Sequence, residues 1–400
     1  MNLKLSFCVN KLPLCFASFK GGAQSLVIQA ADGILTVLVL YDFHSTPLKL
    51  CGEIAENDKI DVILLEHRIE LYVNGELKDE EWPAGNRYFE YGDGIDCDID
   101  VAVTEYSEPV TELPGVISTF ENAEGWRPGN DVFVGDCMPY RKNDEYHVLY
   151  LKDRHHHSSK WTMGAHQWEH ISTKDFKTWY VHPMAVPITE SWEGSICTGS
   201  WIEHEGREYL YYTVRRDRVK PAPICRSVSS DGYHFSKDKN FGFTLDGKYN
   251  KACARDPKVV KGEDGLFHMF LTTKLVKEDR GCLAHYVSKD LEKWEECDTP
   301  IYILPDSNQP ECPDYYKYNG KYYLVFSIQG NAHYMISDKP FSDFKMPENP
   351  IIPCARVPKC AEWQGRLVFV GFDMIGGYAG TMTFKAARAA ENGELIFEEL

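Results

Sequence analysis

One pattern recurs five times in the second part of the chain, and it constrains the fold more than any other feature. An aromatic-rich apolar run such as "LFHMFLTTK" is followed by a second run such as "HYVSKDLEKW", and helical periodicity is nearly absent. The aspartates that close four of these units, Asp175, Asp231, Asp290 and Asp338, are separated by roughly 50 to 60 residues, the scale of one propeller blade. Five such units predict an all-β chain with a five-bladed β-propeller over residues 120–400. An extended sandwich is the alternative, but it does not require five units at one period.

The first part of the chain carries a different β pattern. Runs such as "ILTVLVLYDF" and "IDVAVTEY" alternate in polarity, and "ELYVNGEL" holds an Asn-Gly pair that is typical of a hairpin. A segment with Pro, Gly and little periodicity follows near residue 115. We therefore predict an N-terminal, lectin-like β-sandwich over residues 1–115, with a structural role rather than a catalytic one.

Charge and cysteine content limit the partners and the compartment. Lys and Arg number 43 against 60 Asp and Glu, which gives a net charge of −17 and argues against binding to nucleic acid or to an anionic membrane. The 13 cysteines form no close CxxC pair, which is typical of reduced thiols in a cytoplasmic protein. No stretch approaches the length of a transmembrane span.

Three carboxylates stand just before strand-like runs in three different units. They are Asp136 in "VGDCMPY", Asp256 in "ARDPKVV" and Glu311 in "QPECPDYY". The first strand of each propeller blade lines the central channel. These acids are therefore predicted to occupy equivalent positions in their blades and to converge on one pocket. Three acids in one pocket suit glycoside chemistry, with a nucleophile, a proton shuttle and a group that binds sugar hydroxyls. Most loop aspartates only cap turns, but three at equivalent positions favour function.

These motifs resemble glycoside hydrolase family 32, the family of invertases and fructanases. "RDP" at 255–257 and "ECPD" at 311–314 match motifs of that family, and "GDCMPY" stands where the family carries its nucleophile motif. "WTMGAHQWEHISTKDFKTWYVHPMAV" at 161–186 and "CTGS" at 197–200 are similar to two further family segments. The resemblance covers residues 125–390 and implies a five-bladed propeller enzyme that acts on β-fructofuranosides with retention at the anomeric carbon.

The resemblance also implies roles for single residues. Asp136 would be the nucleophile, Asp256 would stabilise the transition state, and Glu311 would be the general acid and then the base. Arg255 would position hydroxyls and bias the ionisation of its neighbours. Substrate contacts are expected from Trp161, Gln167, Thr198, Arg154 and Cys312.

The surroundings of the acids depart from the family pattern. Gly135 replaces an asparagine before the nucleophile and cannot supply its side-chain hydrogen bonds. Lys152, Asp153, Arg154 and the three histidines that follow lie on a loop that faces the sugar in the family's layout. Their positive charge could replace the lost contacts and accept an acidic or phosphorylated sugar. We therefore expect weak activity on plain sucrose, with Arg154 or a neighbouring histidine contacting the preferred substrate.

The remaining motifs predict no cofactor and no metal. "RHHHSSKW" at 154–160 fits no zinc spacing, and "GGYAG" at 376–380 lacks the Lys-Ser/Thr of a phosphate loop and indicates a turn in the closing blade. Cys137 and Cys312 are expected to be pocket-wall residues, because no nearby base suggests a thiolate. Two other functions stay open: a furanosidase of arabinofuranosidase type, and a sugar-binding propeller without catalysis. The sequence predicts a small sugar or oligosaccharide as partner and leaves a homo-oligomer open.

Overall fold

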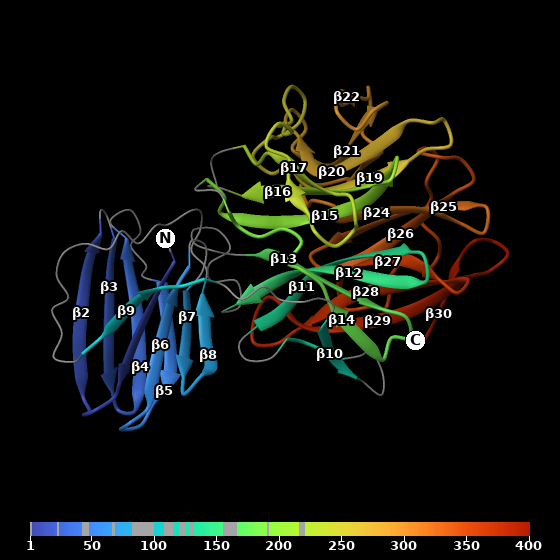
Figure 1. Cartoon of the computed structure of the whole chain (residues 1–400). Coiled ribbons are helices and arrows are strands. Elements are labelled where there is room, and N and C mark those ends of the chain that lie inside the picture. The colour runs from blue at the N-terminus through green and yellow to red at the C-terminus, as the bar shows by residue number, and fades with distance from the viewer. Residues whose placement is uncertain are drawn as a thin grey trace.

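The chain folds entirely from β-strands within the residues that the computed structural model describes, namely 2–21, 24–41, 48–65, 69–81, 100–107, 115–119, 125–128, 132–154, 166–189, 192–215 and 221–400. An N-terminal unit lies beside a larger C-terminal unit (Figure 1). Among the described residues, no helix is long and apolar enough to cross a membrane.

Two antiparallel sheets make up the N-terminal unit. Their orders are β8-β7-β6-β1-β9 and β2-β3-β4-β5. Leu3, Leu5 and Phe7 are buried at alternating positions of β1, and they join residues of both sheets in one hydrophobic core. The strands are β1 (Leu3–Cys8), β2 (Leu14–Gly21), β3 (Gln24–Ala31), β4 (Ile34–Tyr41), β5 (Leu48–Glu53), β6 (Lys59–Leu64), β7 (Ile69–Val73), β8 (Glu76–Glu81) and β9 (Ala102–Glu105). The boundary at residues 115–120 and a lectin-like role stay predictions.

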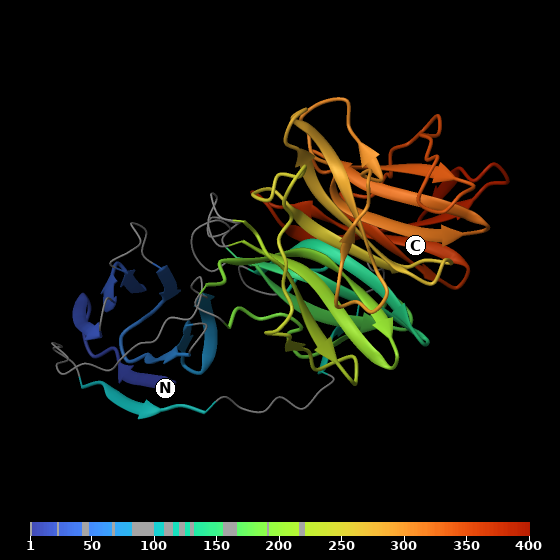
Figure 2. The same cartoon turned by 90° about the horizontal axis from the view of Figure 1, so that it is seen from above.

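The C-terminal unit is the predicted five-bladed β-propeller. The first strands of the five blades contact one another in the cyclic order β11, β15, β19, β24, β27 and back to β11, and the blades fan out around them (Figure 2). The strands of the first two blades are β10 (Gly115–Thr119), β11 (Val132–Lys142), β12 (Glu145–Arg154), β13 (Gln167–Thr173), β14 (Thr178–Val181), β15 (Ser195–His204), β16 (Arg207–Arg215), β17 (Ile224–Ser229) and β18 (Ser236–Lys237).

The last three blades complete the ring. Val134 of β11 pairs with Gly380 of β29, so that the first and last blades form one continuous sheet. The strands of the last three blades are β19 (Arg255–Lys261), β20 (Phe267–Leu275), β21 (Arg280–Ser288), β22 (Glu295–Glu296), β23 (Tyr302–Ile303), β24 (Glu311–Tyr318), β25 (Lys321–Ile328), β26 (Asn331–Ser337), β27 (Arg356–Trp363), β28 (Arg366–Met374), β29 (Gly380–Ala389) and β30 (Leu395–Glu398).

Asp175, Asp231 and Asp290 fix the turn after the third strand of their blades, whereas Asp338 follows its serine directly and pairs with Lys321. Oδ1 of Asp231 accepts hydrogen bonds from the backbone N–H groups of Tyr233 and His234, each at 2.8 Å, and the Ser229 hydroxyl lies 2.9 Å from the same oxygen. Asp290 accepts two equivalent backbone bonds. A side chain that satisfies two consecutive backbone donors fixes the turn, which explains why the motif recurs at the blade period.

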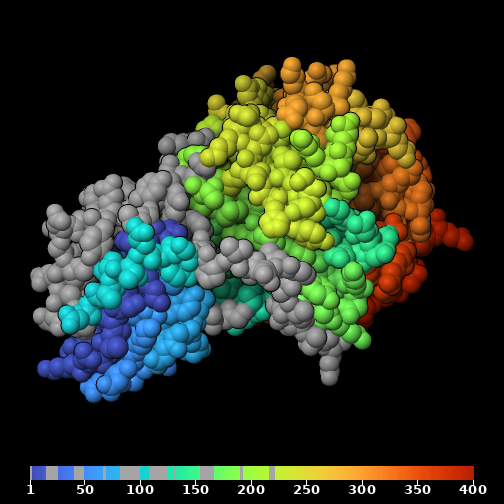
Figure 3. Space-filling model, in the orientation of Figure 1, coloured from blue at the N-terminus to red at the C-terminus, as the bar shows by residue number. Residues whose placement is uncertain are grey.

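Charged side chains connect the N-terminal unit to the propeller. The Lys152 ammonium in β12 lies 3.3 Å from Glu80 of β8 and 3.1 Å from Glu169 of β13. The N-terminal unit therefore contacts β12, the strand that ends just before the histidine-rich segment. Figure 3 shows the N-terminal unit beside the propeller.

The buried guanidinium of Arg226 joins the second blade to the third. It donates to Asp238 at 2.6 Å, to Glu292 at 2.7 Å and to the carbonyl of Leu291 at 2.9 Å. We predict that Arg226→Leu lowers the free energy of unfolding by about 3 kcal/mol, because the Asp238 carboxylate, which is 20% exposed, and the buried carbonyl of Leu291 lose their donor. Glu292→Gln is the control, since that side chain is half exposed and its loss costs at most about 1 kcal/mol. Denaturant unfolding measures both, and equal effects would contradict the assignment.

Candidate active site

A cavity of about 620 Å³ opens where the first strands of all five blades begin. Each of these strands departs from regular pairing once, at Val134/Cys137, Ile196/Gly199, Arg255/Lys258, Glu311/Asp314 and Arg356/Lys359. Such a bulge bends a strand and re-aims its side chains. Residues from all five bulges line the cavity, and the three predicted acids are among them.

The three acids occupy three successive residue positions of the bulge and not one equivalent position, which corrects the expectation from the sequence. Glu311 is the last regularly paired residue before its bulge, opposite Ser327. Asp256 is one step further along, with a φ of 57°, and Cys312 and Val357 occupy the same step with φ of 51° and 41°. Asp136 stands a further step along its strand. Because successive residues of a strand point to opposite sides, these offsets let the acids approach the cavity from different directions.

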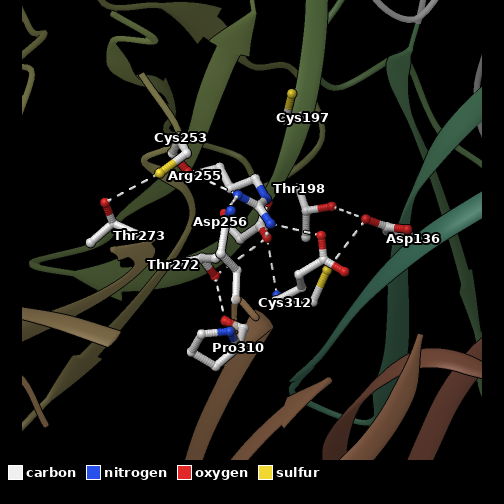
Figure 4. Close-up of polar contacts among 12 residues, drawn as sticks. Asp136, Cys197, Thr198, Cys253, Arg255, Asp256, Thr272, Thr273, Pro310 and Cys312 are labelled. Atoms are coloured by element: carbon white, nitrogen blue, oxygen red, sulfur yellow. Dashed lines mark hydrogen bonds and ion pairs between the residues drawn. The ribbon is translucent and has the colours of Figure 1, made fainter. Parts of the chain in front are cut away.

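Three donors hold the carboxylate of Asp136. The Tyr378 hydroxyl donates to Oδ1 at 2.8 Å, while the Thr198 hydroxyl and the Cys312 thiol, the latter at 3.4 Å, donate to Oδ2. Figure 4 shows Thr198 and Cys312 directed at this carboxylate from two other blades. Burial, followed by the charges of Asp136 and Asp256, raises the pKa of the Cys312 thiol well above its ordinary value. The thiol therefore stays protonated and acts as a donor.

Arg255 links the other two acids. Its Nη2 donates to Glu311 at 2.7 Å, its Nε lies 3.5 Å from Asp256, and its Nη1 donates to Gln309 and to the carbonyl of Cys253. Burial alone would lower the pKa of Arg255, but the carboxylates of Asp256 and Glu311 raise it above its ordinary value. The neighbouring Arg and Asp are thus both directed into the cavity, with the Glu311 side chain 38% exposed there.

Asp256 is almost fully buried. Its Oδ2 accepts the backbone N–H of Cys312 at 3.0 Å and is 3.5 Å from the Thr272 hydroxyl (Figure 4). A carboxylate fixed in this way by a neighbouring blade is held in a single orientation.

Tyr378 was not predicted as a site residue. It lies in "GGYAG", whose glycines indicated only a turn, and its hydroxyl bonds a carboxylate 242 positions earlier in the chain. A Cβ at Gly135 would lie 2.8 Å from that hydroxyl and 3.2 Å from Cβ of Leu151. The tyrosine therefore occupies the space beside Gly135, where the family pattern would place an asparagine side chain.

The predicted substrate contacts lie in different places. Thr198 and Cys312 line the cavity. Gln167 is buried in β13, where its Oε1 accepts the backbone N–H of Ile188 at 2.8 Å, and the cavity lining does not include it. Trp161 and the side chain of Arg154 lie outside the described residues.

Two residues of the predicted sugar-facing loop form ion pairs or hydrogen bonds with other side chains of the protein. Lys152 lies between Glu80 and Glu169. Asp153 is buried 2.7 Å from Nε2 of His166, and the His166 ring packs against Tyr378 with centroids 5.2 Å apart. His166 itself lines the cavity. Asp153 therefore supports the cavity wall through His166.

Comparison with known proteins relates the amino-acid sequence to a family. The model of the glycosyl hydrolases family 32 N-terminal domain matches residues 137–346, which is more than half of the chain. Sucrose-6-phosphate hydrolases from Vibrio alginolyticus and Bacillus subtilis are 28% and 30% identical over alignments of 216 and 203 residues that cover 51% and 47% of this chain. The matched stretch spans 42% and 41% of those two relatives.

Two solved structures share the fold. Fructan 1-exohydrolase IIa from Cichorium intybus superposes with a TM-score of 0.57 at 19% identity, over 69% of this chain and 60% of its own. Sucrose-6-phosphate hydrolase from Lactobacillus gasseri does so with a TM-score of 0.56 at 16% identity, over 68% of this chain and 63% of its own. The fold predicted from the five repeats is confirmed.

We predict that Gly135→Ala displaces the Tyr378 hydroxyl and releases the Asp136 carboxylate. Overpacking of this kind costs about 1–3 kcal/mol, and a loss of that size in transition-state stabilisation lowers activity on the best substrate by about 5- to 150-fold. The same change in a Tyr378→Ala background should cost much less, because residues in contact are not additive. Initial rates of the four proteins measure the coupling, and additive losses would contradict the contact.

Proposed function

Because the chain belongs to glycoside hydrolase family 32, we propose that it hydrolyses β-fructofuranosidic bonds with retention at the anomeric carbon. The observation that carries the proposal is the meeting of Asp136, Asp256 and Glu311 in one cavity, with Arg255 between two of them. Hydrolysis with retention needs a nucleophilic carboxylate and a separate acid on the two sides of the scissile bond.

Asp136 is proposed as the nucleophile. Its three donors orient both carboxylate oxygens, which fixes the atom that attacks the anomeric carbon. As the glycosidic bond breaks, a covalent fructosyl ester forms on Asp136. Water then attacks the same carbon, the ester bond breaks, and Asp136 is regenerated.

Glu311 is proposed as the acid that protonates the leaving-group oxygen and then as the base that deprotonates the attacking water. Its side chain is 38% exposed and lines the cavity, and Arg255 donates to one of its oxygens. Asp256, buried and fixed by the backbone of Cys312, is proposed to bind the sugar hydroxyls whose hydrogen bonds strengthen in the transition state.

We predict that Glu311→Gln lowers kcat/KM, which reports the steps up to cleavage of the glycosidic bond, by about 10²–10⁴-fold on substrates with a poor leaving group. The loss should be much smaller when the leaving group is an activated phenol, because such a group departs without protonation. Asp338→Asn, a change of the same kind at an exposed turn, is the control. Equal losses with both leaving groups would remove Glu311 from the role of acid.

The substrate is proposed to carry a negative charge on the leaving sugar. The curated relatives named above are sucrose-6-phosphate hydrolases. Arg356 lines the cavity in the fifth blade at the bulge position equivalent to Arg255 and Glu311. It donates to the backbone carbonyl of Gln329 at 3.0 Å, and no carboxylate pairs with it among the described residues. A half-exposed arginine without an acidic partner suits a phosphate oxygen.

We predict that Arg356→Gln raises KM for sucrose 6-phosphate by about 10- to 100-fold, the cost of a charged hydrogen bond, and leaves KM for sucrose within about twofold. Initial rates on sucrose, sucrose 6-phosphate, inulin and a nitrophenyl arabinofuranoside measure specificity. Arg280→Gln, which changes an arginine away from the cavity lining, is the control. A preference for plain sucrose that Arg356→Gln does not alter would contradict the anionic substrate, and activity on the arabinofuranoside alone would contradict the fructosidase assignment.

A further inference from the structure

Three buried histidines meet in the first blade, apart from the residues that line the candidate active site. His147 lies in β12, His170 in β13 and His182 directly after β14, and they are 2%, 0% and 6% exposed. One ring nitrogen of each lies within 4.8 Å of a ring nitrogen of the other two. No other grouping of three histidine, cysteine or acidic side chains at such distances occurs among the described residues.

Hydrogen bonds within the protein do not satisfy this cluster. Nε2 of His170 lies 3.0 Å from both the Tyr140 hydroxyl and Nδ1 of His147, whereas Nδ1 of His170 is buried and has no hydrogen-bond partner. A neutral imidazole has one donor and one acceptor, so either tautomer leaves one polar atom of His170 unpaired. An unpaired buried polar atom of this kind is costly and points to a missing ligand.

The third blade provides an internal comparison. His268 and His285 occupy the positions of His147 and His170, since each pair stands diagonally across the second and third strands of its blade. There Nδ1 of His268 bonds Nε2 of His285 at 2.9 Å, and the Asp264 carboxylate bonds the second nitrogen of His268. The position of His182, whose N–H donates to the carbonyl of His170, is Cys297 in the third blade. A histidine pair can thus be structural, and the first blade differs from the third by a third imidazole.

The cluster is reached from outside. A cavity of about 420 Å³ is lined by His182, Glu145, Ser172, Tyr233 and neighbouring residues. The Glu145 carboxylate lies 3.7 Å from Nε2 of His147 and accepts the Ser172 hydroxyl at 3.0 Å, and that hydroxyl lies 2.8 Å from Nε2 of His182. An entry path and an oxygen ligand are therefore both present beside the imidazoles.

We propose that His147, His170 and His182 bind one Zn²⁺ ion, with Glu145 or a water molecule as the fourth ligand. Three imidazoles and one oxygen are a common tetrahedral zinc set. Zinc–nitrogen bonds of about 2.0–2.1 Å place ligand nitrogens about 3.4 Å apart, so ring rotation must draw the nitrogens inward by about 1 Å. The nearby Lys142 ammonium would oppose a cation, but it is paired with Glu208. The expectation of no metal rested on the "RHHHSSKW" segment, whereas these histidines lie in β12, in β13 and directly after β14.

The test titrates Zn²⁺ into the chelator-treated full chain and follows binding by competition with a chromogenic chelator. We expect one Zn²⁺ per chain from this site, and His182→Gln should weaken its binding by at least about tenfold. His285→Gln changes the equivalent of His170 in the third blade and should leave the affinity unchanged. Replacement of His155, His156 and His157 by glutamine should also leave it unchanged, which separates this site from the sequence-adjacent histidines.

A second readout guards against variants that fold poorly. Zn²⁺ should raise the unfolding temperature of the wild-type chain but not of His182→Gln, because only the folded state holds the complete site. His182 is the most exposed of the three, so its replacement risks the fold least. Absence of stoichiometric zinc, or zinc binding that survives in a folded His182→Gln chain, would overturn the proposal. Loss of zinc in the His155–His157 variant alone would overturn it as well.

Discussion

The candidate active site depends on one irregularity that all five inner strands share. Each strand loses its regular pairing at one point near its start, and the residues at that point line the cavity. A regular strand would point every second side chain into the neighbouring blade. The bulges instead let an aspartate, a glutamate and an arginine from different blades reach one another, as the contact of Arg255 with Glu311 illustrates. The scaffold around them is held by packing between blades, so the acids stand on rigid elements.

The segment that closes the propeller ring also contacts Asp136 in the candidate active site. The last blade joins the first through Val134 and Gly380, and Tyr378 lies in the turn just before that junction. Its hydroxyl bonds Asp136, and it occupies the space that Gly135 leaves open. The loss of a side chain at Gly135 is thereby offset by a residue from the other end of the propeller. The Asp136 carboxylate therefore keeps a donor on this side although the family's asparagine is absent.

The sequence predicts what is local or repeated. The aspartates at the ends of third strands recur because Asp231 and Asp290 each bind two backbone donors of a turn, and this regularity is visible as a period. The three acids could be predicted because each stands just before a strand-like run in the sequence. Long-range contacts leave no such signal. Tyr378 touches Asp136 across 242 positions, and the offset of the three acids within their bulges depends on strand register. Gln167 lies in a matched segment, yet it bonds Ile188 inside the blade. The three-histidine cluster shows no signal in the sequence for the same reason, since its members lie in β12, in β13 and just after β14.

The most direct test of the account asks whether Asp136 carries the covalent intermediate. The Glu311→Gln chain, mixed with an activated fructofuranoside and quenched in acid during turnover, would be digested and its peptides mapped by mass spectrometry. The account predicts a fructosyl ester on Asp136, because Thr198, Cys312 and Tyr378 aim that carboxylate into the cavity and Glu311 is no longer available to activate water. An ester on Asp256, or a released fructose of inverted anomeric configuration, would contradict it.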